Sequence, residues 1–303
     1  MFFLDTILPI FATTVLPVFL VAAAGFVLAW RLPLDSRTLG RILFYLATPT
    51  LVFRSLYQMQ IDANALRNLA LISVTVTVTT ALLGWLASFD QPRNRRAAFT
   101  LTSGISNNGN MGIPISYFAF GDAGLALGSI YYVINSFLGN TLGVVVASSG
   151  KTPIMGALRQ SLRVPVLYAA ILGALCNRTG VVLPAGMFRA VDLLANAAIP
   201  GMLILLGMQL RHAPIRERQF IIFRSVGIRL LGGPVLAALL CLMLGVAGVN
   251  RNVIILQAAM PTAVMTAVLA TEYDTAPRLV ATVIFFSTLV SMVTLSLVLW
   301  FLL

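Results

Sequence analysis

Long apolar runs, each separated from the next by a short polar or basic stretch, make up nearly the whole chain. A transmembrane helix needs about 20 predominantly apolar residues, and ten runs approach or exceed that length. They cover residues 7–29, 38–57, 66–88, 97–119, 122–147, 162–180, 184–209, 219–247, 251–272 and 277–302. The pattern predicts an all-α membrane protein with ten transmembrane helices.

The composition agrees with this prediction. The chain is 59% hydrophobic and 10% charged, whereas soluble domains carry about 25% charged residues. The net charge of +11 would also suit a nucleic-acid-binding protein, but the basic residues lie in short loops between apolar runs, as a membrane topology signal does. We therefore expect a lipid bilayer around the chain and no nucleic acid partner. Cys176 and Cys241 lie in apolar runs without a disulfide or metal-binding pattern, and we expect no cofactor.

Basic residues are distributed unequally between the two sides of the predicted membrane. Because loops rich in Lys and Arg stay in the cytoplasm, the bias predicts a multi-pass protein of the inner (plasma) membrane with both termini outside the cytoplasm. The loops after spans 1, 3, 5, 7 and 9, with their flanks, hold Arg31, Arg37, Arg41, Arg93, Arg95, Arg96, Lys151, Arg159, Arg163, Arg211, Arg216, Arg218, Arg224, Arg229 and Arg278. The opposite side holds Arg54, Arg67, Arg178, Arg189 and Arg251.

The two halves of the chain resemble each other. The segment VLPVFLVAAAG at 15–25 aligns with RVPVLYAAILG at 163–173, and Pro33 and Pro49 then align with Pro184 and Pro200. Each half would hold five spans, and an odd number makes the second copy enter the membrane from the opposite side. We expect a first five-helix repeat, a short cytoplasmic linker and an inverted second repeat, an architecture typical of transporters. Their bounds are 1–147, 148–161 and 162–303.

The fourth span of each half is interrupted by residues that break helices. Gly and Pro in the middle of a span release backbone groups that lipid cannot satisfy, so such breaks survive where they are buried in protein or line a wet cavity. Pro114 and Pro261 would suit the first turns of new half-helices, starting near Ile113 and Met260. The positive ends of two such half-helices would attract an anion. The interruptions are SNNGNMGIP (106–114) in span 4 and LQAAMPTAVMT (256–266) in span 9.

Asparagines inside the first break favour binding of a carboxylate. Polar residues are costly inside an apolar span, and neutral amides would hold a carboxylate without a buried Lys or Arg. A packing kink is the alternative interpretation of the breaks, and hydrogen bonding between helices is the alternative for the polar residues of span 5. The expected substrate-binding residues are Asn107, Asn108, Asn110, Pro114 and Pro261, followed by Gln257, Thr262, Tyr132 and Asn135.

The broken spans resemble those of a known family. The motif NNGNMGIP at 107–114 and the stretch AAMPTAVMTAVLATEYDTAPRLVATVIF at 258–285 are similar to the auxin efflux carrier family, which includes the plant PIN-FORMED auxin carriers and bacterial relatives. The resemblance implies the fold of bile-acid/sodium symporters and sodium–proton carriers, with the broken helices of spans 4 and 9 crossed. It further implies a homodimer, a scaffold from spans 1, 2, 6 and 7, and a crossover (transport) domain from spans 3–5 and 8–10 that moves like an elevator.

The same resemblance implies efflux of small organic anions, such as auxin-like acids or dicarboxylates, with Asn107 at the substrate carboxylate. The chain departs from the plant members in two respects. Its linker after span 5 is short, and span 3 has Thr75, Thr77, Thr79 and Thr80 where a charged residue would stand. A channel is the alternative from another class. We expect no enzyme, because intramembrane hydrolysis would need His with Glu, or paired Asp, at depth.

Ion coupling is open at the level of sequence. Uniport driven by the membrane potential is favoured over symport with sodium or protons, because carboxylates and His are scarce at mid-membrane. Sodium could use Asn110 and Thr266 as ligands. Asp192 lies one turn from Arg189, which favours a structural pair, while a pairing with Arg54 or a coupling role are the alternatives.

Overall fold

The computed structural model describes residues 7–59, 62–211 and 219–303, with the side chains of residues 219 and 220 left out. Arg216 and Arg218, which contribute to the predicted charge bias, lie outside the described residues. The part of the chain up to residue 147 contains η1 (Phe11–Val15), α2 (Leu16–Arg31), α3 (Ser36–Ile42), η2 (Leu43–Ala47), α4 (Thr48–Gln58), α5 (Ala63–Ala87), α6 (Arg93–Gly104), η3 (Asn108–Gly112), α7 (Ile113–Leu138), η4 (Gly139–Gly143) and α8 (Val144–Ala147). The rest contains α9 (Ile154–Ser161), α10 (Pro165–Thr179), α11 (Ala185–Leu210), α12 (Gln219–Gly227), η5 (Ile228–Gly232), α13 (Gly233–Met243), α14 (Gly248–Ala258), α15 (Met265–Glu272) and α16 (Pro277–Leu302). Each η element is one wide π turn within a longer helix.

Six of the described helices are long and apolar enough to cross a membrane: Ile7–Arg31, Ala63–Ala87, Asn108–Ala147, Ala185–Leu210, Ile221–Met243 and Pro277–Leu302. The four other expected spans take different forms. The span expected at 38–57 is built from α3, η2 and α4 in succession, and that at 162–180 is the 15-residue α10. The spans expected at 97–119 and 251–272 are each divided in two. The protein is therefore a multi-pass all-helical membrane protein.

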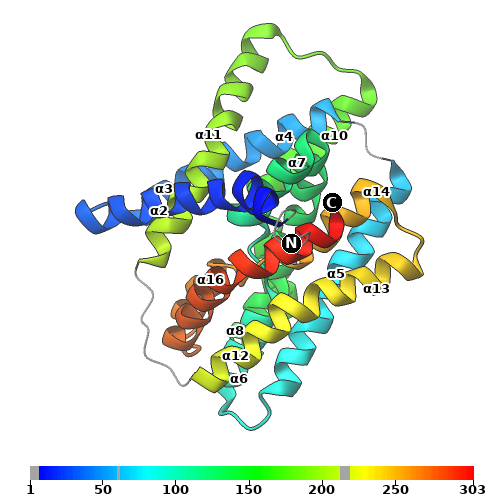
Figure 1. Cartoon of the computed structure of the whole chain (residues 1–303). Helices are drawn as coiled ribbons and strands as arrows, with labels where there is room; N and C mark the ends of the chain where they lie inside the picture. The colour runs from blue at the N-terminus through cyan, green and yellow to red at the C-terminus, as the bar shows by residue number, and fades with distance from the viewer. Residues whose placement is uncertain (1–6, 60–61, 212–218) are drawn as a thin grey trace.

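The helices pack into two groups around α7. In one group α11 packs on α2 and α4, and α10 packs on α4. In the other, α5 packs on α6 and α13, while α16 packs on α6 and α12. Figure 1 shows α4, α10 and α11 in the upper part of the view with α7 beside α4 and α10, α2 at the left, and α5, α6, α12 and α13 in the lower part.

Glycines allow close backbone contacts between helices of the first group. A Cβ on Gly25 of α2 would overlap the backbone carbonyl of Ile204 in α11, and one on Gly173 of α10 would lie 2.6 Å from the carbonyl oxygen of Phe53 in α4. Because neither backbone can move away cheaply, only glycine fits. Close approach of backbones is a common way to pack helices in lipid, and these are the two glycines that the sequence alignment of the halves pairs with each other.

Two further features position the site. The helix that begins at Asn108 bends sharply at Gly121, whose φ of 61° lies in the region that favours glycine. This bend separates the second part of span 4 from span 5. The expected linker at 148–161 contains the short helix α9, where Ser161 bonds to Thr141 of η4 at 2.7 Å.

Candidate functional site

The two broken spans meet through their backbones. Residues 105–107 and 261–263 are non-helical and run antiparallel, with an isolated β-type pairing at their centre. The N–H of Asn107 donates to the carbonyl of Pro261 at 2.7 Å, and a second backbone hydrogen bond of 2.9 Å closes the pair on its other side. Two released backbone groups at each break are therefore satisfied by the other break and need no partner from lipid.

The second half of span 4 begins earlier than the sequence predicts. We expect a start near Ile113 with Pro114 in the first turn, but the helix starts at Asn108, and Pro114 lies after the wide turn η3. The N–H of Gly112 donates to the carbonyl of Asn107 at 3.0 Å across that turn. The backbone pairing ends at Asn107, so the chain is free to coil from the next residue.

The second half of span 9 begins later than the sequence predicts. Its expected start is near Met260, but α15 starts at Met265. Pro261 lies in the extended segment 261–263, which pairs with residues 105–107; this pairing of the two breaks is called the crossing below. The lack of an N–H on Pro261 costs nothing there, and its carbonyl accepts a hydrogen bond. The pairing of residues 261–263 occupies the backbone that a helix would need, so coiling is delayed until the crossing has ended.

A cavity of about 980 Å³ lies against this crossing. Its wall includes the first turn of the span 4 half-helix and the segment that leads into α15, joined by parts of α3, η2, α7, α11 and α16. Both half-helix starts therefore face one space, although they begin at other residues than expected. The wall residues used below are Ser36, Arg37, Arg41, Asn107, Asn108, Asn110, Tyr132, Asn135, Leu205, Gln209, Ala263, Met265 and Glu272.

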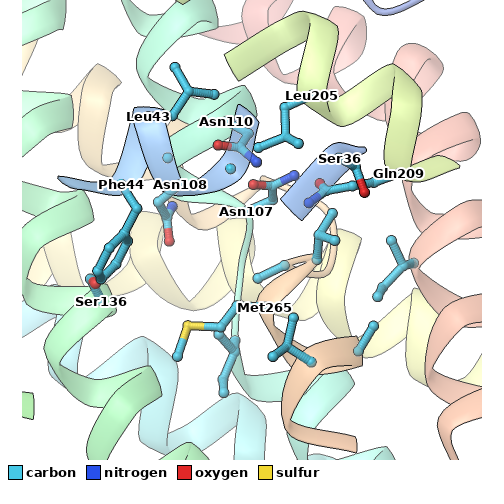
Figure 2. Close-up of a pocket in the computed structure, with 18 of the residues that line it drawn as sticks. Ser36, Leu43, Phe44, Asn107, Asn108, Asn110, Ser136, Leu205, Gln209 and Met265 are labelled. Carbon is cyan, nitrogen blue, oxygen red and sulfur yellow. The ribbon is translucent and has the colours of Figure 1, made fainter. Parts of the chain in front are cut away.

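Asn107 and Gln209 bring unused amide atoms to the cavity. Asn107 is 5% exposed, and its Nδ2 is buried without a hydrogen-bond partner. The Oε1 of Gln209 on α11 is likewise buried and unpartnered. Figure 2 shows the ends of the two side chains facing each other beside Ser36. A buried polar atom without a partner costs free energy, so this pair is poised to gain from a polar ligand. Gln209 is a residue that the sequence analysis missed, although it is polar within an apolar span.

Asn108 and Gln257 hold the two broken spans together. The Nδ2 of Asn108 donates to both the backbone oxygen and the Oε1 of Gln257, each at 2.8 Å. The Oδ1 of Asn108 accepts from Ser106 at 2.6 Å, and the Nε2 of Gln257 donates to Ser116 at 3.0 Å. Asn108 lines the cavity, while Gln257 is fully buried behind it. Each polar side-chain atom of this pair already has a partner within the protein.

Two expected residues of α7 line the cavity in different ways. The ring of Tyr132 lies so close to Gly109 that an added Cβ there would come within 2.7 Å of it. The amide of Asn135 accepts from Thr77 and donates to Ser73, each at 2.8 Å. Tyr132 thus forms a wall of the cavity, whereas the amide of Asn135 ties α7 to α5.

The threonines near span 9 use their hydroxyls for helix structure. Thr262 donates to the backbone carbonyl of Thr102 at 2.8 Å, and Thr266 donates to that of Ala263 at 2.6 Å. Both are fully buried. Asn110 lines the cavity, and no hydrogen bond joins its side chain to another described residue. Within the described ranges, no cluster of His, Cys, Asp or Glu could hold a metal, an observation that does not bear on a sodium site built from neutral oxygens.

The exposed end of the cavity carries charge. Arg37 and Arg41 reach it from α3, and Glu272 reaches it from the end of α15. Asp35 fixes the first turn of α3, because its carboxylate accepts from the hydroxyl of Thr38 at 2.7 Å and from the N–H of Arg37 at 3.0 Å. These hydrogen bonds lower the pKa of Asp35 from its usual value.

A buried arginine at the crossing corrects the sequence analysis, which counts Arg229 with a cytoplasmic loop and expects no buried Lys or Arg at the site. Arg229 is 1% exposed and lies on η5. Its guanidinium donates to the carbonyls of Ser103 at 3.0 Å, Gly104 at 3.1 Å and Ala258 at 2.7 Å. It lies ten residues inside the apolar run 219–247, and this depth is the signal that could have revealed it.

Asp192 takes a partner on another helix. Its Oδ1 accepts from Arg54 of α4 at 2.6 Å, and Arg54 also donates to Asn196 at 2.6 Å. The favoured pairing with Arg189 is not the ion pair that forms, and the alternative pairing with Arg54 is confirmed. This cluster ties α4 to α11 within the first helix group.

Comparisons with known proteins identify the family of the chain. A family described as membrane transport protein matches residues 10–155 and 152–299. An uncharacterized transporter of Methanothermobacter thermautotrophicus is 31% identical over 94% of this chain and 96% of its own length, and one of Methanocaldococcus jannaschii is 25% identical over 88% and 90%. A probable auxin efflux carrier component of rice (Oryza sativa subsp. japonica) is 28% identical over 44% of this chain and 25% of its own length. The chain therefore belongs to the auxin efflux carrier family of membrane transport proteins.

Proposed function

We propose that this protein is a secondary transporter of small organic anions and that it binds a carboxylate of its substrate in the cavity at the crossing. The observation that carries the proposal is the buried, unpartnered Nδ2 of Asn107 in a wall formed by both half-helix starts. A carboxylate there would accept a hydrogen bond from Asn107 and lie near the N–H groups of the helix that starts at Asn108. Gln209 leaves an acceptor beside it for a hydroxyl or N–H group of the substrate.

The electrostatics of the cavity favour an anion. The start of a helix carries about +0.5 elementary charge, and two starts face this space. Among the charged residues of its wall, Arg37 and Arg41 contribute +2 and Glu272 contributes −1, a formal sum of +1. The arginines lie at the exposed end, where they would raise the local concentration of anions before binding.

The packing supports alternating access by two inverted five-helix halves. Gly25 and Gly173 are paired by the sequence repeat, and each lies at a backbone contact of the corresponding helix pair, α2 with α11 and α10 with α4. In this proposal α2, α4, α10 and α11 form the scaffold of spans 1, 2, 6 and 7. The remaining spans, 3–5 and 8–10, carry the crossing past it in an elevator-type movement.

The charge bias of the loops suggests which side the cavity faces. Its exposed end is formed by residues after span 1 (Arg37, Arg41) and at the end of span 9 (Glu272), the side that the bias assigns to the cytoplasm. The structure would then represent the inward-facing state of a plasma-membrane carrier, ready to load an anion for efflux. Dimerisation and ion coupling stay predictions from the sequence.

A binding screen tests the function. Purified protein is heated with indole-3-acetate, malonate or benzoate, each with and without sodium and at two pH values. Binding to the folded state raises the unfolding temperature, so we expect a rise with at least one carboxylate and none with its neutral amide. Saturable uptake of that carboxylate into proteoliposomes would then establish transport. No rise with any carboxylate would contradict the proposal, and a current that never saturates would favour a channel.

A further inference from the structure

The guanidinium of Arg229 contacts both broken spans at the same ends. Its acceptors are the carbonyls of Ser103 and Gly104 at the end of α6 and that of Ala258 at the end of α14. The last carbonyls of a helix lack intrahelical donors and carry its negative end. A single side chain therefore caps the C-terminal ends of both first half-helices.

The surroundings show that Arg229 is built into the protein. One turn earlier on the same helix, the hydroxyl of Ser225 lies 2.8 Å from that of Thr102 and 3.3 Å from that of Ser103. A Cβ on Gly233 would overlap both the guanidinium and the carbonyl of Ala258, so this glycine makes room for the contact. Among the described residues, no carboxylate is bonded to Arg229.

The guanidinium of Arg229 nearly neutralises the helix-end charges on one side of the crossing, while the helix-end charges on the cavity side are not opposed by a buried acidic side chain of the described residues. Each helix end is equivalent to about half an elementary charge, so the two C-terminal ends together carry about −1, which the guanidinium offsets. The two N-terminal ends that face the cavity together carry about +1, and no buried acidic side chain among the described residues opposes them. The remaining charge matches one carboxylate.

We propose that Arg229 is a positioning residue that makes the crossing electropositive and thereby selects substrates bound through a single ionised carboxylate. The inference rests on the proposed anion transport. Without the guanidinium, the negative ends of α6 and α14 would cancel the positive ends that face the cavity. Asn107 follows Gly104 by three residues, at most about 10 Å of extended chain, so the charge lies near enough to act on the anion.

The test compares an anion with its uncharged analogue. The probes are indole-3-acetate with indole-3-acetamide, and malonate with malonamide. The affinity of each probe is measured for the wild type, Arg229→Gln, Arg229→Lys and Arg224→Gln, and the ratio of anion to amide affinity is compared. The last is the matched control, because Arg224 lies on the same continuous helix but is partly exposed and pairs with Asp90. At about 10 Å and an effective dielectric constant of about 20, one charge changes anion affinity on the order of tenfold.

We expect Arg229→Gln to reduce the preference for the anion over its amide on the order of tenfold, with Arg224→Gln unchanged. A purely structural role would weaken both probes equally and leave the preference intact, and that result would overturn the inference. If Arg229→Gln does not fold, Arg229→Met, which also removes the charge, takes its place with the same two outcomes. Arg229→Lys retains the charge and should keep the preference, so a preference lost in Arg229→Lys would overturn the inference. Absence of anion binding by the wild type would instead contradict the proposed function itself.

Discussion

Replacing Asn107 with alanine isolates one proposed contact between the protein and its substrate. The change removes only the side-chain amide, because the N–H that donates to Pro261 belongs to the backbone and remains. Asn108 and Gln257 also keep their mutual hydrogen bonds. The crossing should therefore persist in the variant, and any effect on binding should come from the lost amide.

The structure predicts that Asn107→Ala weakens carboxylate binding without lowering the stability of the unliganded protein. A hydrogen bond to a charged group contributes about 1.5–3 kcal/mol, and each 1.4 kcal/mol is a factor of ten, so affinity for a carboxylate should fall about 10- to 150-fold. The Nδ2 of Asn107 is buried without a partner in the unliganded protein. Removing it relieves a desolvation cost, so unfolding without ligand should occur at the same temperature or higher.

The assay is a titration of indole-3-acetate and malonate into the purified variant, beside thermal unfolding without ligand and uptake into proteoliposomes. Asn64→Ala is the matched control, because Asn64 is exposed on the first turn of α5 and does not line the cavity. Asn107→Asp should lose more affinity than alanine, since it places a negative charge where the carboxylate binds. Unchanged affinity in a folded Asn107→Ala protein would refute the reasoning.

Three further changes test the framework around the site. Gly207→Ala places a Cβ against the backbone of α2 and should cost about 1–3 kcal/mol in denaturant unfolding, whereas Gly186→Ala in open space on the same helix should be neutral; equal effects would contradict the packing argument. Asp35→Ala should speed amide hydrogen exchange in α3 only, and Asp62→Ala, which removes the equivalent cap of α5, should speed it in α5 only. The folded-state pKa of Asp35 is lowered, so its helix cap is fully formed above the ordinary pKa of Asp and is lost as pH falls through the lowered value. If amide exchange in α3 did not change over this pH range, the proposed cap would be contradicted. Arg54→Met should lower the unfolding temperature by a few degrees without changing carboxylate affinity, since neither Arg54 nor its partners on α11 line the cavity. An altered affinity would implicate the pair in transport.

The sequence was most informative about where the helices break. Gly, Pro and Asn within apolar spans mark the two interruptions, because lipid cannot satisfy the backbone groups they release. It could not give the helix starts, Asn108 and Met265 in place of the expected Ile113 and Met260. Those depend on which residues pair across the crossing, and this pairing joins segments more than 150 residues apart.

The roles of individual polar residues were harder to predict. An asparagine in an apolar span signals a polar partner but not its identity: Asn107 leaves its amide nitrogen unpartnered at the cavity, while the amides of Asn108 and Asn135 are occupied within the protein. Arg229 was counted with a loop because a tally of basic residues weighs each alike whatever its depth. Its acceptors are backbone carbonyls, which leave no mark in the sequence.

The backbone pairing between residues 105–107 and 261–263 has a consequence for how such a carrier could acquire new cargo. Main-chain groups fasten the junction, so the side chains of Tyr132, Leu205 and Gln209 around the cavity can be exchanged without loosening it. The shape of the cavity can thus change while the main-chain pairing of the two breaks is kept. One architecture could in this way be retargeted to acids of different size and shape by a few substitutions.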